Sequence, residues 1–410
     1  MEFGFTEEQE KLRKELRDFY VNELPEDYTP HITPVSEKLQ SFYRQLQKKA
    51  GEKGYLTPGW PAEYGGKDLG SIEQGIAAEE QGNMGVVWPG TLAYRFLGPG
   101  LVMFGTEEQK KEFLPAIARG EQVWFEAFTE PEAGTDEANQ RTWAVEDGDD
   151  YIVNGQKTFI SGGYEPDWLV TEVRTADTTP KHRGLSLLMI KADSPGITIR
   201  PLPTMGFGIQ NDIFYDNVRV PKKNMLGQLN RGFYHVMQIF DFERSGTEAP
   251  AHAKRSLHEF VQFCKEEQRN GRPLFDDPEV REKLAWMAVE CEVWRLISWH
   301  AQWWHSERKQ LGPKPYDLSG FFSKKFTTRH AEMRAEIMGT YGQLRKGSKH
   351  AKVVGHSVDV ERAWQSSRSL HAAGTWEVNK IVLATRGLGL PRIPAKFNKE
   401  IMAAIQERKE

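Results

Sequence analysis

The chain changes its residue pattern twice along its length, and this change constrains the fold more than any single motif. Up to about Gly120, and again after Gly227, the segments are amphipathic and have helix-start and helix-stop signals. From Val123 to about Leu226, short runs rich in aromatic and β-branched residues end at Gly, Pro or Asp, which is typical of strands and turns. We therefore expect an α+β protein, with an N-terminal all-α domain (residues 1–121), a middle β-domain (122–228) and a C-terminal α-helical domain (229–410).

Capping signals define the first helical segments. Thr6 and Gln9 have the spacing of a capping box ahead of an apolar helical repeat, and Thr106 and Gln109 repeat it. The N-terminal segment carries acidic residues throughout and lacks the basic and apolar regions of a signal peptide.

Turn signals divide the rest of the chain. Asp147–Gly148 and Asn154–Gly155 each predict the turn of a β-hairpin. Asn270–Gly271 predicts a break between two helices, and the Trp-rich segment 281–307 predicts one long amphipathic helix. The tryptophans of that helix are typical of a core or a subunit interface.

Composition excludes several classes of protein. Among 410 residues, 54 are Lys or Arg and 58 are Asp or Glu, so the net charge of -4 and the lack of a basic stripe argue against nucleic-acid binding. No apolar run approaches the roughly 18 to 20 residues that cross a bilayer. The two cysteines, Cys264 and Cys291, form no motif and indicate a reducing compartment. We expect a cytoplasmic protein that does not bind a membrane.

Several catalytic motifs are absent from the sequence. It contains no P-loop, no dinucleotide-binding GxGxxG and no GxSxG elbow. His300 and His305 lack an accompanying acid at the spacing of a zinc peptidase. We therefore expect no metal site.

Two segments of the β-region suit a flat ring. "FTEPEAGTD" predicts a tight turn that leaves hydroxyls and backbone N–H groups available to a ligand, although an ordinary capped turn would have the same sequence. In "KTFISGG", Phe159 and Ser161 fall on the same side of an extended strand. An aromatic ring beside a hydroxyl can cover the face of a heteroaromatic ligand and bond to its edge.

A carboxylate lies in unusual surroundings in "MQIFDFERSGTEAP". On a helix, Glu243 shares its face with Ile239, Phe240, Gly246 and Thr247, which are apolar or small. A surface ion pair or a satisfied buried acid would explain it. A general base held away from water would explain it equally.

These segments, taken in order, resemble the acyl-CoA dehydrogenases. The resemblance rests on "GWPAEYGG", "FTEPEAGTD", "NGQKTFIS", "DNVRVP", "FDFER", "RNGRPL" and "GTWEVNKIVLATRGLGLPR", and extends from about Phe5 to Arg392. It implies an N-terminal α-domain, a middle β-barrel or sandwich domain, a C-terminal four-helix bundle and FAD as cofactor.

The resemblance assigns roles in the β-domain. Thr129 looks like the hydroxyl that bonds the pyrimidine side of the flavin, with Phe128 beside it. Ser161 looks like the donor near flavin N5, and Phe159 replaces the more common Trp over the ring. Thr135 matches the turn residue that contacts the acyl-CoA.

Further roles fall in the C-terminal domain. Arg269 matches the arginine that reaches FAD phosphates across a subunit interface, a suitable task for a bidentate guanidinium. Thr375 matches a residue near the adenosine of FAD. Asp241 and Arg244 match positions that contact CoA.

The position of the catalytic base departs from the commoner family pattern. Many members have Glu immediately before the Gly-Thr of the last segment, where this chain has Ala373. A minority, resembling isovaleryl- and long-chain-type enzymes and others acting on bulky acyl groups, have the base on another helix just before an arginine. That position is Glu243. The resemblance implies that the Ala373 backbone N–H, with a flavin ribityl hydroxyl, stabilises the enolate at the thioester carbonyl, a task that needs no side chain.

The resemblance implies a complete reaction and several partners. Glu243 would abstract the α proton and the β hydride would pass to flavin N5, giving a 2-enoyl-CoA from a branched, cyclic or bulky acyl-CoA. An electron-transferring flavoprotein is the expected acceptor, and the chain is expected to form a homo-oligomer, a tetramer or dimer. A flavin monooxygenase or lyase of the same fold stays open, as does a catalytically silent subunit of a heteromeric dehydrogenase.

Overall fold

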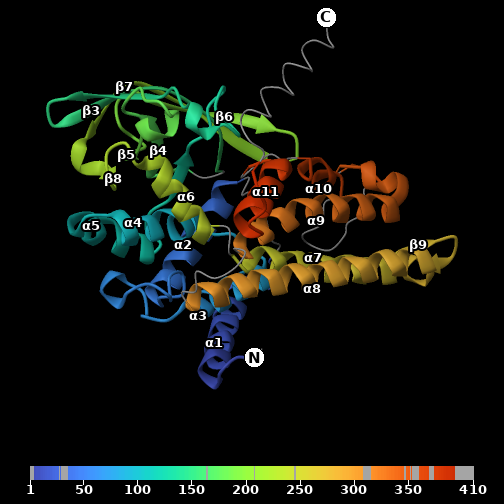
Figure 1. Cartoon of the computed structure of the whole chain (residues 1–410). Helices are drawn as coiled ribbons and strands as arrows, with labels where there is room; N and C mark the ends of the chain where they lie inside the picture. The colour runs from blue at the N-terminus through green and yellow to red at the C-terminus, as the bar shows by residue number, and fades with distance from the viewer. Residues whose placement is uncertain are drawn as a thin grey trace, which may run out of the picture.

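The computed structural model describes most of the chain as helices, then a β-sheet, then helices again (Figure 1). The described residues are 4–26, 28, 36–162, 165–206, 208–243, 246–307, 315–345, 348–350, 352, 360–368 and 374–392, without the side chains of 208, 209, 241–243 and 315–317. The α+β class is confirmed.

The N-terminal helices begin where the sequence supplies caps. They are α1 (Glu7–Glu23), α2 (Glu37–Glu52), α3 (Ser71–Met84), the π-helical turn η2 (Ala93–Leu97), α4 (Gly98–Phe104) and α5 (Glu107–Ala118). The Thr6 hydroxyl accepts from Gln9 N–H at 3.2 Å, and the Gln9 side chain accepts from Thr6 N–H at 3.0 Å. Thr106 and Gln109 form the same two bonds at the start of α5. Both predicted capping boxes are confirmed.

The middle region is one eight-stranded sheet in the order β6-β7-β3-β2-β4-β5-β8, with β1 pairing parallel to β4. The strands are β1 (Trp124–Ala127), β2 (Trp143–Asp147), β3 (Asp150–Ser161), β4 (Trp168–Arg174), β5 (Leu185–Lys191), β6 (Ile197–Thr204), β7 (Gly208–Pro221) and β8 (Met225–Leu226). The long pair β3–β7 is antiparallel and carries two register shifts.

One of the two predicted hairpins exists. Asp147 pairs with Asp150, so β2 and β3 turn at Gly148 as expected. The prediction of a second turn at Asn154–Gly155 is wrong, because both residues lie inside β3 and its pairing with β7 continues on either side. Gly155 is required there for packing. A Cβ on it would lie 2.5–2.8 Å from atoms of Thr142, so only glycine allows these two segments to approach so closely.

Helices return after the sheet. They are α6 (Gly232–Glu243), α7 (Glu248–Glu266), α8 (Pro278–Ser306), α9 (Pro315–Met338), α10 (Val360–Ser366) and α11 (Trp376–Val382), with the short strands β9 (Gln268–Arg269) and β10 (Arg272–Pro273) between α7 and α8. The φ angles of Asn270 and Gly271 are 54° and 76°, as a tight two-residue hairpin requires. The predicted break between helices and the predicted long helix are confirmed.

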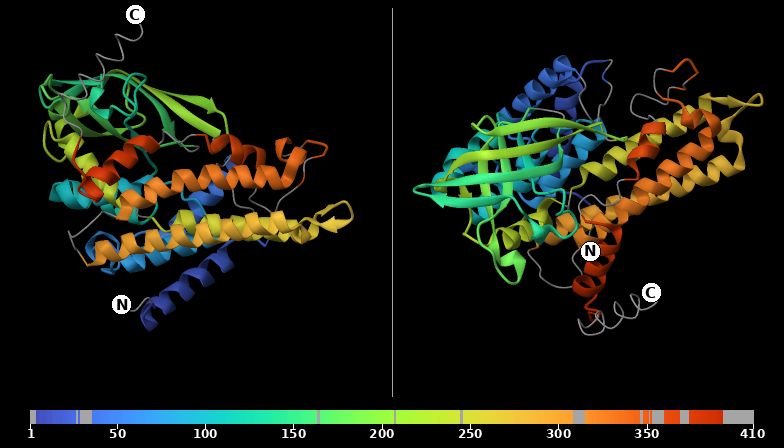
Figure 2. Two further views of the ribbon diagram at one scale, coloured as in Figure 1. Left: turned by 45° about the vertical axis from the view of Figure 1, so that its right-hand side comes forward. Right: turned by 90° about the horizontal axis from the view of Figure 1, so that it is seen from above.

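Two large hydrophobic cores hold these parts. One joins the N-terminal helices to the sheet, where Phe113 of α5 meets the stacked rings of Trp124 and Trp168 edge-on at 5.6 and 5.1 Å. The other lies among α7, α8 and α9, which extend side by side away from the sheet (Figure 2). The predicted domain limits fall in the α5–β1 and β8–α6 connections and stay predictions. No helix in the described part is both long and apolar enough to cross a membrane.

Candidate active site

The chain segment that follows β1 packs an aromatic residue on the helix that carries Glu243 and has a hydroxyl next to that residue in the sequence. Phe128 is buried, and its ring lies 5.4 Å from that of Phe96 and 6.4 Å from that of Phe240 in α6. Thr129 is half-buried, and no described side chain or backbone group bonds to its hydroxyl. Glu243 is the last residue of α6. The segment therefore presents a free hydroxyl beside an apolar contact with α6.

A β-bulge in strand β3, next to Thr129, changes the side of the sheet to which the following side chains point. The N–H of Thr158 donates to the carbonyl oxygen of Thr129 at 2.9 Å, and the register of β3 against β7 shifts between Lys157 and Ile160. Phe159 has φ 56° within this bulge, a left-handed conformation that is strained for a bulky residue. The bulge turns Phe159 outward, where it is 52% exposed, and Ser161 is exposed too.

The loop after Thr129 is closed by one buried carboxylate. Glu130 accepts from the N–H groups of Arg141 and Thr142 at 2.5 and 2.9 Å, so the two ends of loop 131–141 meet. Thr135 is exposed on this loop. Burial would raise the pKa of Glu130, but the Lys157 ammonium and these bonds outweigh burial and hold the pKa below its ordinary value.

The structure separates the remaining predicted residues from this cluster. Arg269 lies in β9, at the tip of the α7–α8 hairpin and at the opposite end of the molecule from β3 (Figure 1). The Thr375 hydroxyl accepts from Val378 N–H at 3.2 Å and caps α11. Asp241 lies in α6, but the structure does not describe its side chain or that of Glu243. Arg244 and Ala373 lie outside the described residues.

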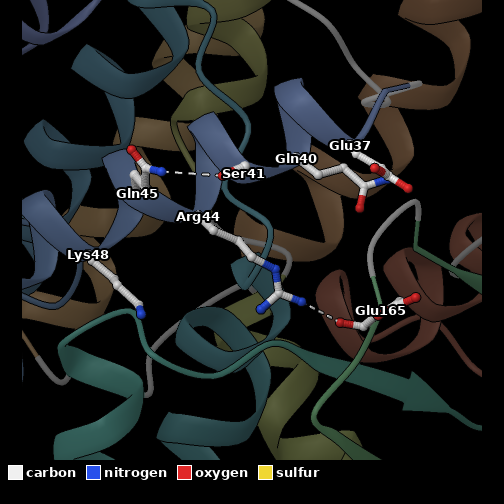
Figure 3. A pocket seen from close by; sticks show the side chains of 7 residues that line it. All are labelled: Glu37, Gln40, Ser41, Arg44, Gln45, Lys48 and Glu165. Atoms are coloured by element: carbon white, nitrogen blue, oxygen red, sulfur yellow. Dashed lines mark hydrogen bonds between the residues drawn. The ribbon is translucent and has the colours of Figure 1, made fainter.

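A polar surface depression lies apart from these residues (Figure 3). Arg44 of α2 points across it and donates to the backbone oxygen of Glu165 at 2.6 Å, with Lys48 on the same helix beside it. None of the predicted site residues lines it. The hydrogen bond from Arg44 connects the segment between β3 and β4 to α2.

Sequence reasoning missed Lys157 and Glu130 as parts of this site. Lys157 is fully buried and lies 2.8 Å from the Glu130 carboxylate. A signal for Lys157 was present: Tyr151 and Val153 face the core, and the two-residue period of a strand places Lys157 on the same side. The sequence contains no comparable signal for the bulge that turns Phe159 and Ser161 outward.

Comparison with known proteins identifies the family. Models of acyl-CoA dehydrogenase domains match residues 6–121 (N-terminal domain), 126–218 (middle domain) and 230–388 (C-terminal domain). The chain belongs to the acyl-CoA dehydrogenase family. The family consists of enzymes, so the predictions of the family, of its three-part fold and of an enzyme are confirmed.

Similar proteins align along nearly the whole length of the chain. It is 34% identical over 403 residues to "Acyl-CoA dehydrogenase FadE26" of Mycobacterium tuberculosis, covering 96% of this chain and 99% of that protein. "Acyl-CoA dehydrogenase FadE29" of the same organism is 31% identical over 402 residues, covering 96% and 100%. The solved "ChsE4-ChsE5 complex from Mycobacterium tuberculosis" contains a chain with 33% identity and a TM-score of 0.82, covering 96% and 100%.

Proposed function

We propose that this protein is an FAD-dependent dehydrogenase that converts an acyl-CoA thioester into the 2-enoyl-CoA. The observation that carries the proposal is the cluster of Thr129, Phe159 and Ser161 around the β3 bulge, next to the segment that packs on α6. Neither hydroxyl bonds to a group in the described part of the chain, and Phe159 is 52% exposed.

These residues fit a flavin ring. The Thr129 and Ser161 hydroxyls can donate to ring oxygen and nitrogen atoms, and the phenyl ring of Phe159 can cover the ring face, which would remove exposed apolar surface from water. The strain at Phe159 (φ 56°) is typical of a residue that is held in place for a ligand. FAD, when bound, would supply the acceptor for the hydride from the substrate β carbon.

The proposed base is Glu243. Glu243 lies at the C-terminal end of α6, which is the negative end of the helix dipole, and this favours proton uptake by a carboxylate. Ala373, through its backbone N–H, is proposed to stabilise the charge that develops on the thioester oxygen. Thr135, Asp241 and Arg244 are proposed to contact the CoA thioester.

We propose a branched, cyclic or otherwise bulky acyl group. The position of the base on α6 supports this class. A solved structure described as "Tcur3481-Tcur3483 steroid ACAD" supports it too, with 29% identity and a TM-score of 0.83 over 96% of this chain. An electron-transferring flavoprotein is the proposed acceptor, because the "Caffeyl-CoA reductase-Etf complex subunit CarC" of Acetobacterium woodii is 28% identical over 393 residues.

The assembly of the enzyme decides where the proposed FAD contacts of Arg269 and Thr375 are made. We propose a homo-oligomer, a tetramer or dimer, in which Arg269 reaches FAD phosphates of the partner and Thr375 lies near the adenosine. A heteromeric assembly is the second candidate, because two of the similar structures, ChsE4-ChsE5 and Tcur3481-Tcur3483, are each described by the names of two proteins.

The visible spectrum tests the proposal. The purified chain should show flavin bands that bleach when the correct acyl-CoA is added without oxygen. Glu243→Gln should keep the flavin bands, and its rate of bleaching should fall by about 1,000-fold or more. A loss of this size is in the range expected when a general base is removed. Glu282→Gln, on exposed α8 surface, is the matched control and should bleach like the wild type.

Other results would redirect the proposal. A yellow protein that no acyl-CoA in a broad panel bleaches would favour a monooxygenase or lyase of the same fold. A colourless protein that does not take up FAD would favour a silent subunit of a heteromeric dehydrogenase.

A further inference from the structure

A fully buried lysine lies behind the candidate active site. The Nζ atom of Lys157 is 2.8 Å from Oε1 of Glu130, 3.0 Å from the carbonyl oxygen of Phe128 and 2.6 Å from that of Glu172. It also donates to the side-chain oxygen of Gln140. The exposed fraction of Lys157 is 0%, so water cannot replace any of these partners.

The groups that accept hydrogen bonds from Lys157 lie close in sequence to Thr129 and Thr135, two residues proposed to contact the ligands. Phe128 and Glu130 flank Thr129, so the ammonium holds the backbone carbonyl before that residue and the side-chain carboxylate after it. Gln140 lies near the end of loop 131–141, which carries Thr135, and its side-chain amide donates to Glu172 at 2.9 Å.

Lys157 also fixes the strand that carries the aromatic residue. Its backbone pairs with Ile213 of β7 immediately before the bulge, two residues before Phe159 and four before Ser161. The Thr129 segment, loop 131–141 and the β3 bulge therefore meet at a single ammonium group.

Burial and neighbouring charges shift the pKa values of Glu172 and Lys157 in this cluster. Burial raises the pKa of Glu172 well above its ordinary value, with the Glu137 carboxylate adding to the effect. Burial lowers the pKa of Lys157, and the Glu130 carboxylate opposes this. The side-chain carboxylate of Glu130 bonds directly to the Lys157 ammonium, whereas Glu172 bonds to it through its backbone carbonyl oxygen. A buried ion pair of this kind contributes little net stability, but its directed bonds fix positions.

We propose that Lys157 is the positioning residue of this active site, whose ammonium group sets the placement of Thr129, of loop 131–141 and of the β3 bulge relative to one another. The proposal rests on the proposed function for the identity of the ligands. It does not depend on that function for the placement itself.

The test compares Lys157→Met with Lys191→Met. Both remove an ammonium group from a strand of the same sheet, but Lys191 is exposed and bonds only to Asp193 among the described residues, at 3.0 Å. Amide hydrogen exchange of the FAD-free protein is measured at Arg141, Thr142 and Thr158, and the FAD dissociation constant and bound-flavin spectrum are measured in the holoenzyme.

Lys157→Met should speed exchange at these amides by at least about tenfold and raise the FAD dissociation constant by about tenfold or more, since bonds of this charged type carry such factors. Its bound-flavin spectrum should shift as well. Lys191→Met should match the wild type in each measurement.

Several results would overturn the proposal. Exchange in Lys157→Met equal to that in Lys191→Met would do so, as would FAD affinity within twofold of the wild type together with an unchanged spectrum. If Lys157→Met does not fold, Lys157→Met/Glu130→Gln, which removes the Glu130 carboxylate together with its ammonium partner, takes its place with the same expected losses. If the wild type binds no FAD, the proposed function fails, and the exchange data alone decide the placement role.

Discussion

The backbone N–H of Thr158 donates to the carbonyl oxygen of Thr129 at 2.9 Å. This bond joins the segment after β1 to β3 at the point where the bulge begins. Because it involves only backbone atoms, it persists when the side chain of Thr129 is changed. The contribution of the Thr129 hydroxyl to ligand binding can therefore be measured without moving the segment that carries it.

Thr129→Val should weaken FAD binding without lowering stability. A single hydroxyl bond to a neutral acceptor is worth about 0.5–1.5 kcal/mol, so the FAD dissociation constant should rise by roughly two- to tenfold. The melting temperature of the FAD-free protein should stay unchanged, because the hydroxyl has no described protein partner. Equilibrium dialysis and calorimetry measure the two effects.

Thr175→Val is the matched control for that experiment. The Thr175 hydroxyl bonds to the side chains of Ser186 and Asn230, each at 2.7 Å. Its removal should lower stability by about 1 kcal/mol, because the bonds to the Ser186 hydroxyl and to the half-buried Asn230 side-chain oxygen are lost. FAD affinity should not change. The opposite pattern, with loss of FAD affinity only in Thr175→Val, would contradict the role of Thr129.

Local patterns in the sequence predicted most of the fold because each depends on near neighbours. The capping boxes at Thr6 and Thr106 and the turn at Gly148 involve residues within three positions of one another. Asn154–Gly155 failed as a turn because a distant segment decided its structure. Pairing of β3 with β7 and the close approach of Thr142 keep that stretch extended.

The site could be predicted only in part for the same reason. The outward placement of Phe159 and Ser161 depends on a bulge against β7, and pairing partners cannot be read from a single strand. Lys157 finds its partners on segments 27 and 17 positions away, at Glu130 and Gln140. The family resemblance supplied roles for residues, but not the buried charges that hold them.

Arg269→Ala should lower FAD affinity although Arg269 lies far from Thr129 in the same chain. A bidentate guanidinium–phosphate contact is charge-assisted, so its loss should raise the FAD dissociation constant by roughly 10- to 100-fold. Arg272 is the matched control, because it pairs with Arg269 across the β9–β10 hairpin and is also exposed. Equal effects of Arg269→Ala and Arg272→Ala would argue for a general charge effect instead of a phosphate contact.

Both cysteine thiols should be unreactive in the folded protein at pH 8. Burial raises the pKa of Cys264 to about 11 and that of Cys291 to about 12. At pH 8 roughly one Cys264 thiol in a thousand is then the reactive thiolate, and this fraction grows as pH rises. Ellman's reagent should detect no thiol in native protein and both after unfolding. One rapidly reacting thiol in the native state would contradict this burial, and Cys264→Ser would identify which cysteine is responsible.

An apolar stripe on α8 should form a contact between subunits. Trp286, Val289, Val293 and Leu296 follow helical spacing and are 51%, 53%, 38% and 51% exposed, and such a row on one helix face marks an interaction surface. Val289→Lys would place an unpaired charge in that contact, at a cost of several kcal/mol. The mass measured by light scattering should fall to half that of the wild type or less.

Val21→Lys provides the control for that change. Val21 is 62% exposed on α1, so the same substitution there should leave the mass of the assembly unchanged. An unchanged mass for Val289→Lys would exclude the stripe from the contact. If the wild-type chain is monomeric when purified alone, the apolar stripe on α8 is exposed in that sample. This result would indicate that α8 binds a different subunit, which the purified sample lacks.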